Sequence, residues 1–264
     1  MESADLTWIR FALFWGGLLF FLVLELIRPY RPGTISKLSR WIANLGLTIF
    51  NSLVLNLFFT AFILQTASYV TRHKLGVLNL YPLPYGLKLL ITVLFLDLIL
   101  YVWHLLNHEM PFLWGFHRVH HSDLNMDVST ASRFHIGELA ISAVIKMGLI
   151  FFLGADLFGV FLFESLVVLT SQFHHSSLKI PVWFERIYGI LFVPPSMHRI
   201  HHSVVIKERD SNYGTILSLW DRGLGTLTSK VDQAKLRIGV GAYQRADKLH
   251  FHHLLLMPFT KRIR

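Results

Sequence analysis

The stretch DLILYVWHLLNHEMPFLWGFHRVHH, residues 97–121, carries an apolar run directly into a series of histidines. Residues three and four apart lie on the same face of a helix, so His104 and His108 present two imidazoles toward one point. The spacing H-x-x-H-H then appears twice, at His117, His120 and His121 and again at His198, His201 and His202. These three groups predict a metal centre at the end of apolar helices.

The number of imidazoles indicates more than one metal ion. A closed tetrahedral zinc site uses four ligands, whereas eight or nine imidazoles would serve two neighbouring ions and leave a position open on each. A single H-x-x-H-H could be accidental, because a lone histidine in an apolar protein is usually a packed core residue, but two copies beside an H-x-x-x-H are not expected by chance. The remaining histidines, by contrast, read as surface or interfacial residues: His73, His250, His252 and His253.

Composition places the chain in a membrane. It has 264 residues, of which 53% are hydrophobic and 22 are Phe, and its mean hydropathy is +0.49. Such values are typical of an integral membrane protein. The absence of cysteine excludes disulfides, thiolate zinc sites and iron–sulfur clusters. The net charge of +9 is spread beside the apolar segments and forms no aromatic-interleaved stripe, so we expect no nucleic-acid partner.

The apolar segments predict an all-α fold, a multi-span integral membrane helical bundle of about four to five membrane helices in one domain over residues 1–264. A bilayer core of about 30 Å needs around 20 apolar residues per helix. The expected segments are residues 6–27, 42–68, 86–106, 137–153 and 157–173. The last two flank a tight turn at 154–156 and could cross the membrane or form a re-entrant hairpin.

The more polar residues 109–135 and 176–264 are expected to form a helical cap that holds the metal site. The basic residues Arg28, Arg31, Lys37 and Arg40 place the loop after the first span in the cytoplasm, and the cap falls on the same side. Positive charges at 72 and 74, on the opposite side, argue against this orientation. Within the cap, residues 181–193 form an amphipathic stretch that could lie in the membrane interface or be an ordinary buried helix.

Asp97, Tyr101, His104 and His108 are spaced by four, three and four residues and so form one stripe on a helix. An aspartate within an apolar span is costly and should face the bundle interior with a partner. We expect Asp97 to accept a hydrogen bond from a ligand imidazole of another segment. The alternative is a polar contact that only packs helices together.

Together these motifs resemble the fatty acid hydroxylase and sterol desaturase superfamily of membrane-bound di-iron oxygenases. The resemblance covers a core of about residues 92–228 and rests on D-x-x-x-Y-x-x-H-x-x-x-H (97–108), L-W-x-x-H-R-V-H-H-S (113–122), T-A-S-R-x-H-x-x-E (130–138), P-S-M-H-R-I-H-H-S (195–203), N-Y-G (212–214) and W-D-R-x-x-G-T (220–226). Carried over residue by residue, it implies nine ligands to two Fe ions, with O2 as co-substrate and zinc as a replacement in recombinant preparations: His104, His108, His117, His120, His121, His175, His198, His201 and His202. The resemblance alone supplies His175, and the adjacent His174 is the alternative.

Supporting roles follow from the same motifs. Arg133, His135 and Glu138 could form a polar network that supports the ligands or the cap, and Asn212, Tyr213, Trp220 and Asp221 are expected to pack the cap. Three positions depart from the family pattern: Ile136, Ser177 and Leu224 stand where Pro, Asn and Phe are common. None removes a ligand, but they leave the substrate unassigned.

The expected function is an O2-dependent lipid monooxygenase that hydroxylates a sterol, fatty acyl or related chain. A desaturase with the same site is the alternative within enzymes. A non-enzymatic metal-binding or transport protein would instead string polar residues through several spans.

With no haem or flavin domain recognisable in the sequence, electrons are expected from a separate donor of ferredoxin or cytochrome b5 type. A basic face would suit an acidic donor, although lipid headgroups would explain the same charges. Its residues are Arg118, Lys207, Arg209, Lys230, Lys235 and Arg237.

Overall fold

The computed structural model describes residues 3–55 and 61–261, and within these ranges every regular element is a helix. Five helices are long and apolar enough to cross a membrane, which confirms the predicted multi-span bundle. The elements, in order, are α1 (Ser3–Ile27), α2 (Lys37–Leu55), α3 (Ala61–His73), η2 (Val77–Asn79), α4 (Tyr85–Glu109), α5 (Pro111–His121), η3 (Val128–Ser132), α6 (Ile136–Leu153), α7 (Leu157–His175), α8 (Val182–Tyr188), α9 (Pro195–His201), α10 (Ile206–Arg209), α11 (Leu219–Leu224), η4 (Ala246–Lys248), α12 (Phe251–Leu256) and η5 (Met257–Phe259).

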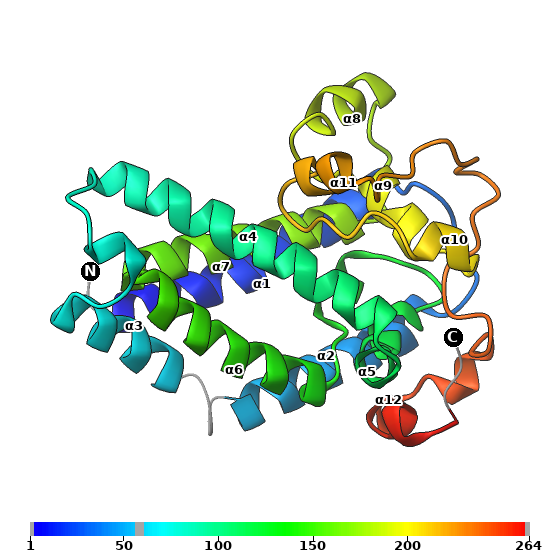
Figure 1. Ribbon diagram of the computed structural model, residues 1–264. Helices are drawn as coiled ribbons and strands as arrows, with labels where there is room; N and C mark the ends of the chain where they lie inside the picture. Colours follow the sequence, from blue (N-terminus) through cyan, green and yellow to red (C-terminus); the bar gives the residue numbers. More distant parts are fainter. Residues whose placement is uncertain (1–2, 56–60, 262–264) are drawn as a thin grey trace.

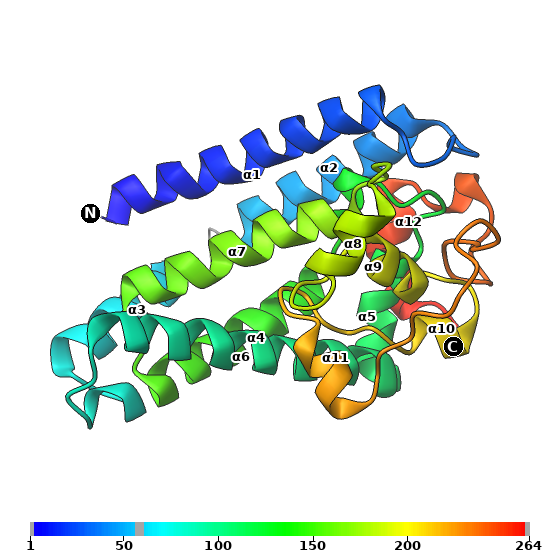
Figure 2. The same cartoon turned by 90° about the horizontal axis from the view of Figure 1, so that it is seen from above.

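The long helices lie side by side and alternate in direction. Figures 1 and 2 show α1, α4 and α7 running toward the end of the bundle that carries the cap, while α2, α3 and α6 lead back toward the opposite end. Their outward faces keep large apolar side chains exposed, as a lipid-facing surface requires. All short helices from α8 onward gather at one end, so the bundle has a cap end and an opposite end.

The second predicted span differs from the observed helices. A continuous span was expected over 42–68, whereas α2 ends at Leu55 and α3 begins at Ala61, and the intervening residues 56–60 lie outside the described part of the chain. Only α2 is long and apolar enough to be a candidate span, because α3 has 13 residues and polar side chains on one face. α3 packs against α6 at the end opposite the cap.

The pair formed by α6 and α7 reaches the end opposite the cap. Gly154 ends α6 with φ of 81°, a left-handed conformation that glycine adopts freely. The turn then contacts the connection between α3 and α4: Asn79 donates to the Gly154 carbonyl at 3.2 Å, and the Tyr85 hydroxyl donates to Asp156 at 2.9 Å. The pair therefore extends as far as its neighbours, which favours two crossings over a shallow re-entrant hairpin.

The stretch predicted to be amphipathic forms α8, and it lies apart from the bundle in Figure 1. None of its seven residues is buried, and Trp183 and Ile187 are 65% and 64% exposed. The alternative of an ordinary buried cap helix is therefore wrong, because α8 contacts the bundle through Tyr188, whose ring lies 5.1 Å from that of Phe173 on α7, while no residue of α8 is buried. Exposed apolar side chains beside Lys179 and Arg186 fit the interfacial location that the sequence suggested.

Candidate metal centre

The structure brings the nine histidines named from the sequence together in two groups. In each group the candidate ligand nitrogens all lie within 4.8 Å of one another, and every residue is buried. The described residues contain no other group of this kind. The larger group draws on α4, α5 and α9, and the smaller on α5, α7, α9 and the residue after it. The first group is His104, His108, His117, His121 and His201, and the second is His120, His175, His198 and His202.

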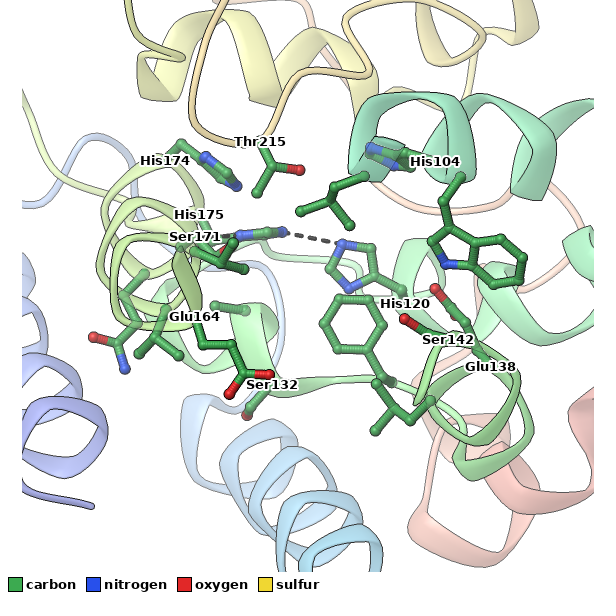
Figure 3. Close-up of a pocket in the computed structure, with 18 of the residues that line it drawn as sticks. His104, His120, Ser132, Glu138, Ser142, Glu164, Ser171, His174, His175 and Thr215 are labelled. Atoms are coloured by element: carbon green, nitrogen blue, oxygen red, sulfur yellow. Dashed lines mark hydrogen bonds between the residues drawn. The ribbon is translucent and has the colours of Figure 1, made fainter. Parts of the chain in front are cut away.

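Distances between imidazole nitrogens fit a shared metal ion. Two imidazoles bound to one ion with bonds of about 2.0–2.1 Å lie roughly 2.8–3.4 Å apart at ordinary coordination angles. In the four-histidine group, the Nε2 atom of His175 lies 3.1 Å from Nε2 of His120 (Figure 3). It also lies 2.9 Å from Nε2 of His198. In the larger group the Nε2 atoms of His117 and His121 are 3.2 Å apart. The donor sets therefore fit two neighbouring metal ions.

The opposite ring nitrogen of several histidines is held by a fixed acceptor. The Nδ1 atom of His117 lies 2.9 Å from Glu138, and that of His108 lies 3.2 Å from Asp210. Backbone carbonyls accept from three more, at 2.7–2.8 Å: Tyr213 for His104, Ser211 for His201 and Ser171 for His175. Donation from Nδ1 leaves the Nε2 lone pair free, and Nε2 of His104, His108 and His201 accordingly has no partner in the protein.

Five of the grouped histidines outside the membrane helices are held in the neutral form. Burial, followed by the neighbouring imidazoles, keeps the pKa of His120, His121, His198, His201 and His202 well below the ordinary value of 6.5. A metal ion needs an unprotonated imidazole nitrogen, so little proton release opposes binding at neutral pH.

Asp97 does not hold a ligand histidine, and the expectation that it would is wrong. Its carboxylate accepts the backbone N–H groups of Ile216 and Leu217, both at 3.2 Å, and the Trp220 indole N–H at 2.8 Å. All three donors come from residues 216–220, and no imidazole is among them. Asp97 instead holds residues 216–220 against α4, and Tyr213, just before them in the chain, presents its carbonyl to His104.

Tyr101, one turn along α4, fastens the next part of the same loop. Its hydroxyl lies 2.8 Å from the Thr226 hydroxyl, which donates to Asp221 at 2.6 Å. Asp221 in turn accepts the backbone N–H groups of Tyr213 and Gly214, both at 2.8 Å. The apolar surroundings raise the pKa of Asp221, an effect that these donors oppose. The stripe on α4 therefore positions the cap segment that supports His104 and His201.

Arg133 and Glu138 both contact the helix or the side chains of the second histidine cluster. Arg133 donates to the Val119 carbonyl at 2.9 Å, and to Asn44 and Ser122 at 2.8 Å each, so it fixes the end of α5. Burial lowers the pKa of Arg133 to about 10, although nearby Asp123 opposes this. His135 serves the cap differently: its ring accepts from Gly137 at the start of α6 and lies 3.1 Å from the Leu255 carbonyl.

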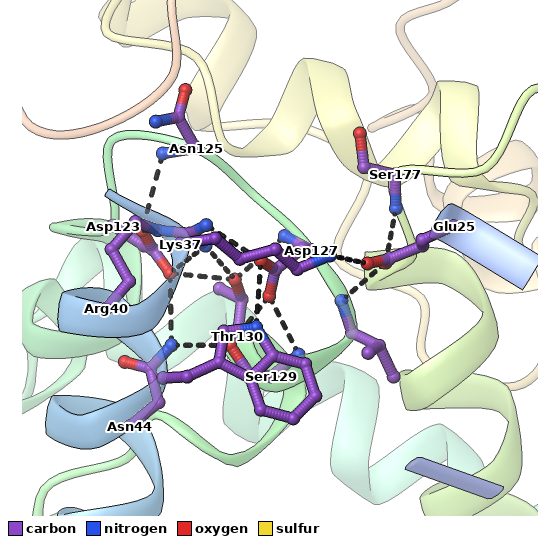
Figure 4. Close-up of polar contacts among 12 residues, drawn as sticks. Glu25, Lys37, Arg40, Asn44, Asp123, Asn125, Asp127, Ser129, Thr130 and Ser177 are labelled. Carbon is purple, nitrogen blue, oxygen red and sulfur yellow. Dashed lines mark hydrogen bonds and ion pairs between the residues drawn. The ribbon is translucent and has the colours of Figure 1, made fainter. Parts of the chain in front are cut away.

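A buried ionic network that the sequence did not predict braces the segment after the second cluster (Figure 4). Arg40 donates to Asp123 at 2.8 Å and to Asp127 at 2.7 Å. Glu25 accepts from Lys37 and from the backbone N–H groups of Val128 and Ser177, each at 2.8 Å. The network joins α1 and α2 to the segments that follow His121 and His175. The sequence predicted only a topology-setting role for Lys37 and Arg40, and it gave no role to Glu25, Asp123 or Asp127.

His174 lies outside both groups, although its ring centroid is 4.0 Å from that of His198. His175 belongs to the four-histidine group, as the resemblance implied. Helical geometry explains the difference, because consecutive residues on α7 point about 100° apart. The tail histidines His250, His252 and His253 join neither group.

Two residues of the expected basic face are not available to a partner. Arg118 is fully buried and donates to the Met257, Thr260 and Lys261 carbonyls. Arg209 is buried over the Trp114 ring, 4.3 Å from its centroid, and pairs with Asp210. The basic side chains that remain exposed are Lys207, Lys230, Lys235 and Arg237.

An apolar cavity of about 330 Å³ opens beside the histidines and extends between the membrane helices (Figure 3). His104, His117, His120, His175 and His198 line one end. The walls are largely apolar and come from α1, α4, α6 and α7, among them Phe14, Leu18, Leu100, Leu139, Phe163 and Val167. A volume in this range is typical of a small-molecule site, and its walls suit a hydrocarbon chain.

The chain is similar in sequence to several known proteins. The chain is 30% identical over 161 residues to the ornithine lipid hydroxylase OlsE of Rhizobium tropici, covering 60% of this chain and 46% of that protein. It is 33% identical over 137 residues to alkylglycerol monooxygenase of Caenorhabditis elegans, covering 52% and 26%, and 27% identical over 141 residues to cholesterol 25-hydroxylase of Homo sapiens, covering 53% and 50%. The chain thus spans half or less of these relatives, and no solved structure matches it significantly.

The family model for fatty acid hydroxylase matches residues 89–226, just over half of the chain. This range contains all nine grouped histidines as well as Asp97, Tyr101, Arg133 and Glu138. On these grounds, the chain belongs to the fatty acid hydroxylase family.

Proposed function

We propose that this protein is a membrane-bound, di-iron, O2-dependent monooxygenase that hydroxylates a C–H bond of a lipid chain. The observation that carries the proposal is the pair of histidine groups facing an apolar cavity that extends between membrane helices. The relatives are named for oxidation of ornithine lipid, alkylglycerol and cholesterol, so lipid hydroxylation is favoured over desaturation.

Each part of the site has a task in this reaction. The nine grouped histidines would hold two irons, which supply the activation of dioxygen that oxidation of an unactivated C–H bond requires. Glu138, Asp210 and the carbonyls of Ser171, Ser211 and Tyr213 orient the ligand imidazoles. The apolar walls hold the chain near the metals and exclude water from it.

The metal site is proposed to face the cytoplasm, where a separate ferredoxin or cytochrome b5 type donor would supply electrons. The exposed Lys207, Lys230, Lys235 and Arg237 lie in the cap and would attract an acidic donor.

Metal transport is disfavoured by the charges deeper in the bundle. The cavity leads from the histidines to Arg10 and Lys146, and these cations would repel a divalent ion on any path through the helices.

Metal analysis of the purified protein tests the proposal. Two irons per chain are expected, and His175→Gln should lose one of them, whereas the matched neighbour His174→Gln should keep both. In cells, expression should produce lipids that have gained one oxygen. One tightly held zinc that survives His175→Gln would contradict the di-iron site, and lipids that have lost two hydrogens would identify a desaturase.

A further inference from the structure

The cavity ends in a cluster of charges far from the metal groups. Lys146 of α6 donates to Glu164 of α7 at 2.7 Å, and Arg10 of α1 forms a second ion pair with the same carboxylate. All three side chains line the cavity, and Figure 3 shows Glu164 on the same cavity as His120 and Ser142. Ionisable residues inside a membrane are expensive and mark functional sites by default.

The cluster sits deep in the bundle, toward the end opposite the cap. Each of its residues lies seven positions, or about 10 Å, from the end of its helix that is remote from the cap. These ends are Ser3 for α1, Leu153 for α6 and Leu157 for α7. From the cluster to the metal groups the helices rise by about 12 Å between Lys146 and Glu138, and about 16 Å between Glu164 and His175.

The charges do not balance. Glu164 is buried and carries one negative charge, but two cations contact it. An ion pair that only clasped two helices would need one cation, and the second adds a desolvation cost without a partner of its own. A second cavity of about 280 Å³ between α1, α2 and α7 shares Arg10 and Glu164 and adds the hydroxyls of Thr48, Ser52 and Ser165. The cluster therefore stands between an apolar cavity and a more polar one.

We propose that Arg10, Lys146 and Glu164 bind a small anionic oxygen group, a carboxylate or a phosphate, at the end of the lipid substrate remote from the oxidised carbon. The excess positive charge binds the anion, and Glu164 competes with it for the two cations. The apolar cavity holds the intervening chain. An extended chain advances about 1.3 Å per carbon, given C–C bonds of about 1.5 Å. The inference rests on the proposed function and places oxidation roughly nine to thirteen carbons from the anionic group.

Binding measurements test the anionic subsite without requiring turnover. The metal-loaded protein in phosphatidylcholine nanodiscs is titrated with tetradecanoic acid, tetradecyl phosphate and tetradecan-1-ol. At least one of the two anions should bind roughly 10- to 100-fold more tightly than the alcohol, as for hydrogen bonds to charged groups. The stronger of the acid and phosphate arms identifies the headgroup. Equal affinity for all three probes would overturn the inference.

Two variants should act in opposite directions. Lys146→Met should weaken binding of the preferred anion toward that of the alcohol, whereas Glu164→Gln should strengthen it because the competing carboxylate is gone. Lys88→Met is the matched control, since Lys88 contacts Asn79 at the same end of the bundle and does not line the cavity. Equal changes for the anions and the alcohol would indicate a purely structural cluster.

If Lys146→Met fails to fold, the wild-type comparison and Glu164→Gln still decide. Iron content is measured in the same samples. A protein that holds two irons but shows no preference for anions would contradict the anionic subsite alone. A protein without iron would contradict the proposed function, and the binding data would still test the subsite.

Discussion

At the scale of single residues, five of the nine grouped histidines are oriented by a contact of the nitrogen that faces away from the group. Carboxylates hold His117 and His108, and backbone carbonyls hold His104, His175 and His201. Such contacts fix both the tautomer and the direction of the ring before any metal arrives. The protein therefore orients these five imidazoles without a metal ion.

Replacing Glu138 should loosen the five-histidine group selectively. Glu138→Ala removes the acceptor of His117, and loss of such an outer contact typically lowers metal affinity or activity about 10- to 100-fold. Glu138→Gln keeps an acceptor oxygen and should retain most of the affinity. Metal titration checks both variants, with Ser142→Ala on the same face of α6 as control. Equal metal affinity in Glu138→Ala and wild type would show that the contact is dispensable.

Spacing in the sequence was sufficient to find eight of the nine grouped histidines, because their period matches a helix. His175 was identified only through the resemblance, because two adjacent histidines do not indicate which of them lies on the helix face that points to the metal site. The carbonyls of Ser171, Ser211 and Tyr213 could not be predicted, because every residue has a carbonyl and only the fold decides which one meets a ring. Asp210 was not predicted either, although a carboxylate shortly after the last histidine cluster is a residue type that orients ligand histidines.

At the scale of elements, the segment 211–226, here called the bracket, is held against α4 by hydrogen bonds to Asp97 and Tyr101. Asp97 holds Ile216, Leu217 and Trp220, and Tyr101 reaches Asp221 through Thr226. The sequence correctly placed Asp97 and Tyr101 on one stripe, but it could not indicate that their partners come from a loop more than a hundred residues later.

Asp97→Asn should destabilise this bracket. The amide group would turn an N–H toward N–H donors, and an unsatisfied buried group costs about 1–3 kcal/mol. Thermal unfolding should show the loss, accompanied by reduced metal occupancy through Tyr213 and His104. Trp220→Phe removes one bond and should cost only about 1 kcal/mol. Wild-type stability and metal content in Asp97→Asn would contradict the bracket.

The ion pair between Arg40 of α2 and Asp123 should make the stability of the protein depend on pH. Burial would raise the pKa of Asp123, but Arg40 outweighs it and lowers that pKa below the ordinary value. In the wild type this stabilisation is fully present above about pH 4 and is lost only in stronger acid.

Arg40→Met should cost about 3–5 kcal/mol, because it leaves buried carboxylates unpaired. The pKa of Asp123 then rises above its unfolded value, the native state binds more protons, and stability should increase as pH falls from about 8 to 5. Denaturation of the variant across this range checks the sign, and the wild type serves as the control. A variant whose stability is flat or rises with pH would contradict the account.

At the scale of the whole molecule, the helices place the loops at two ends. The connection 28–36 and the cap lie at one end, and the connections near 74–84 and 154–156 lie at the other. Apolar length alone predicted this alternation, because each crossing reverses direction. The positive charges did not settle which end faces the cytoplasm. Arg40, one of the charges used for that prediction, forms a buried ion pair and is not a free surface charge.

The absence of cysteine allows a direct test of orientation. Single cysteines at Lys207 and Lys230 should react with an impermeant maleimide from the same side of sealed vesicles, and a cysteine at Lys74 should react only from the other side. The proposed orientation assigns the first pair to the cytoplasm. Labelling of all three from one side would contradict the five crossings.

The dependence of His104, His108 and His201 on residues 210–213 also sets an order of events during biogenesis. The ribosome releases all nine grouped histidines before the acceptors at Asp210, Ser211 and Tyr213 emerge, so membrane insertion precedes a competent site. A chain truncated after residue 205 should still integrate into membranes but retain little iron on purification. If the site holds iron as proposed, the iron content of the purified chain reports whether the cap has closed over it.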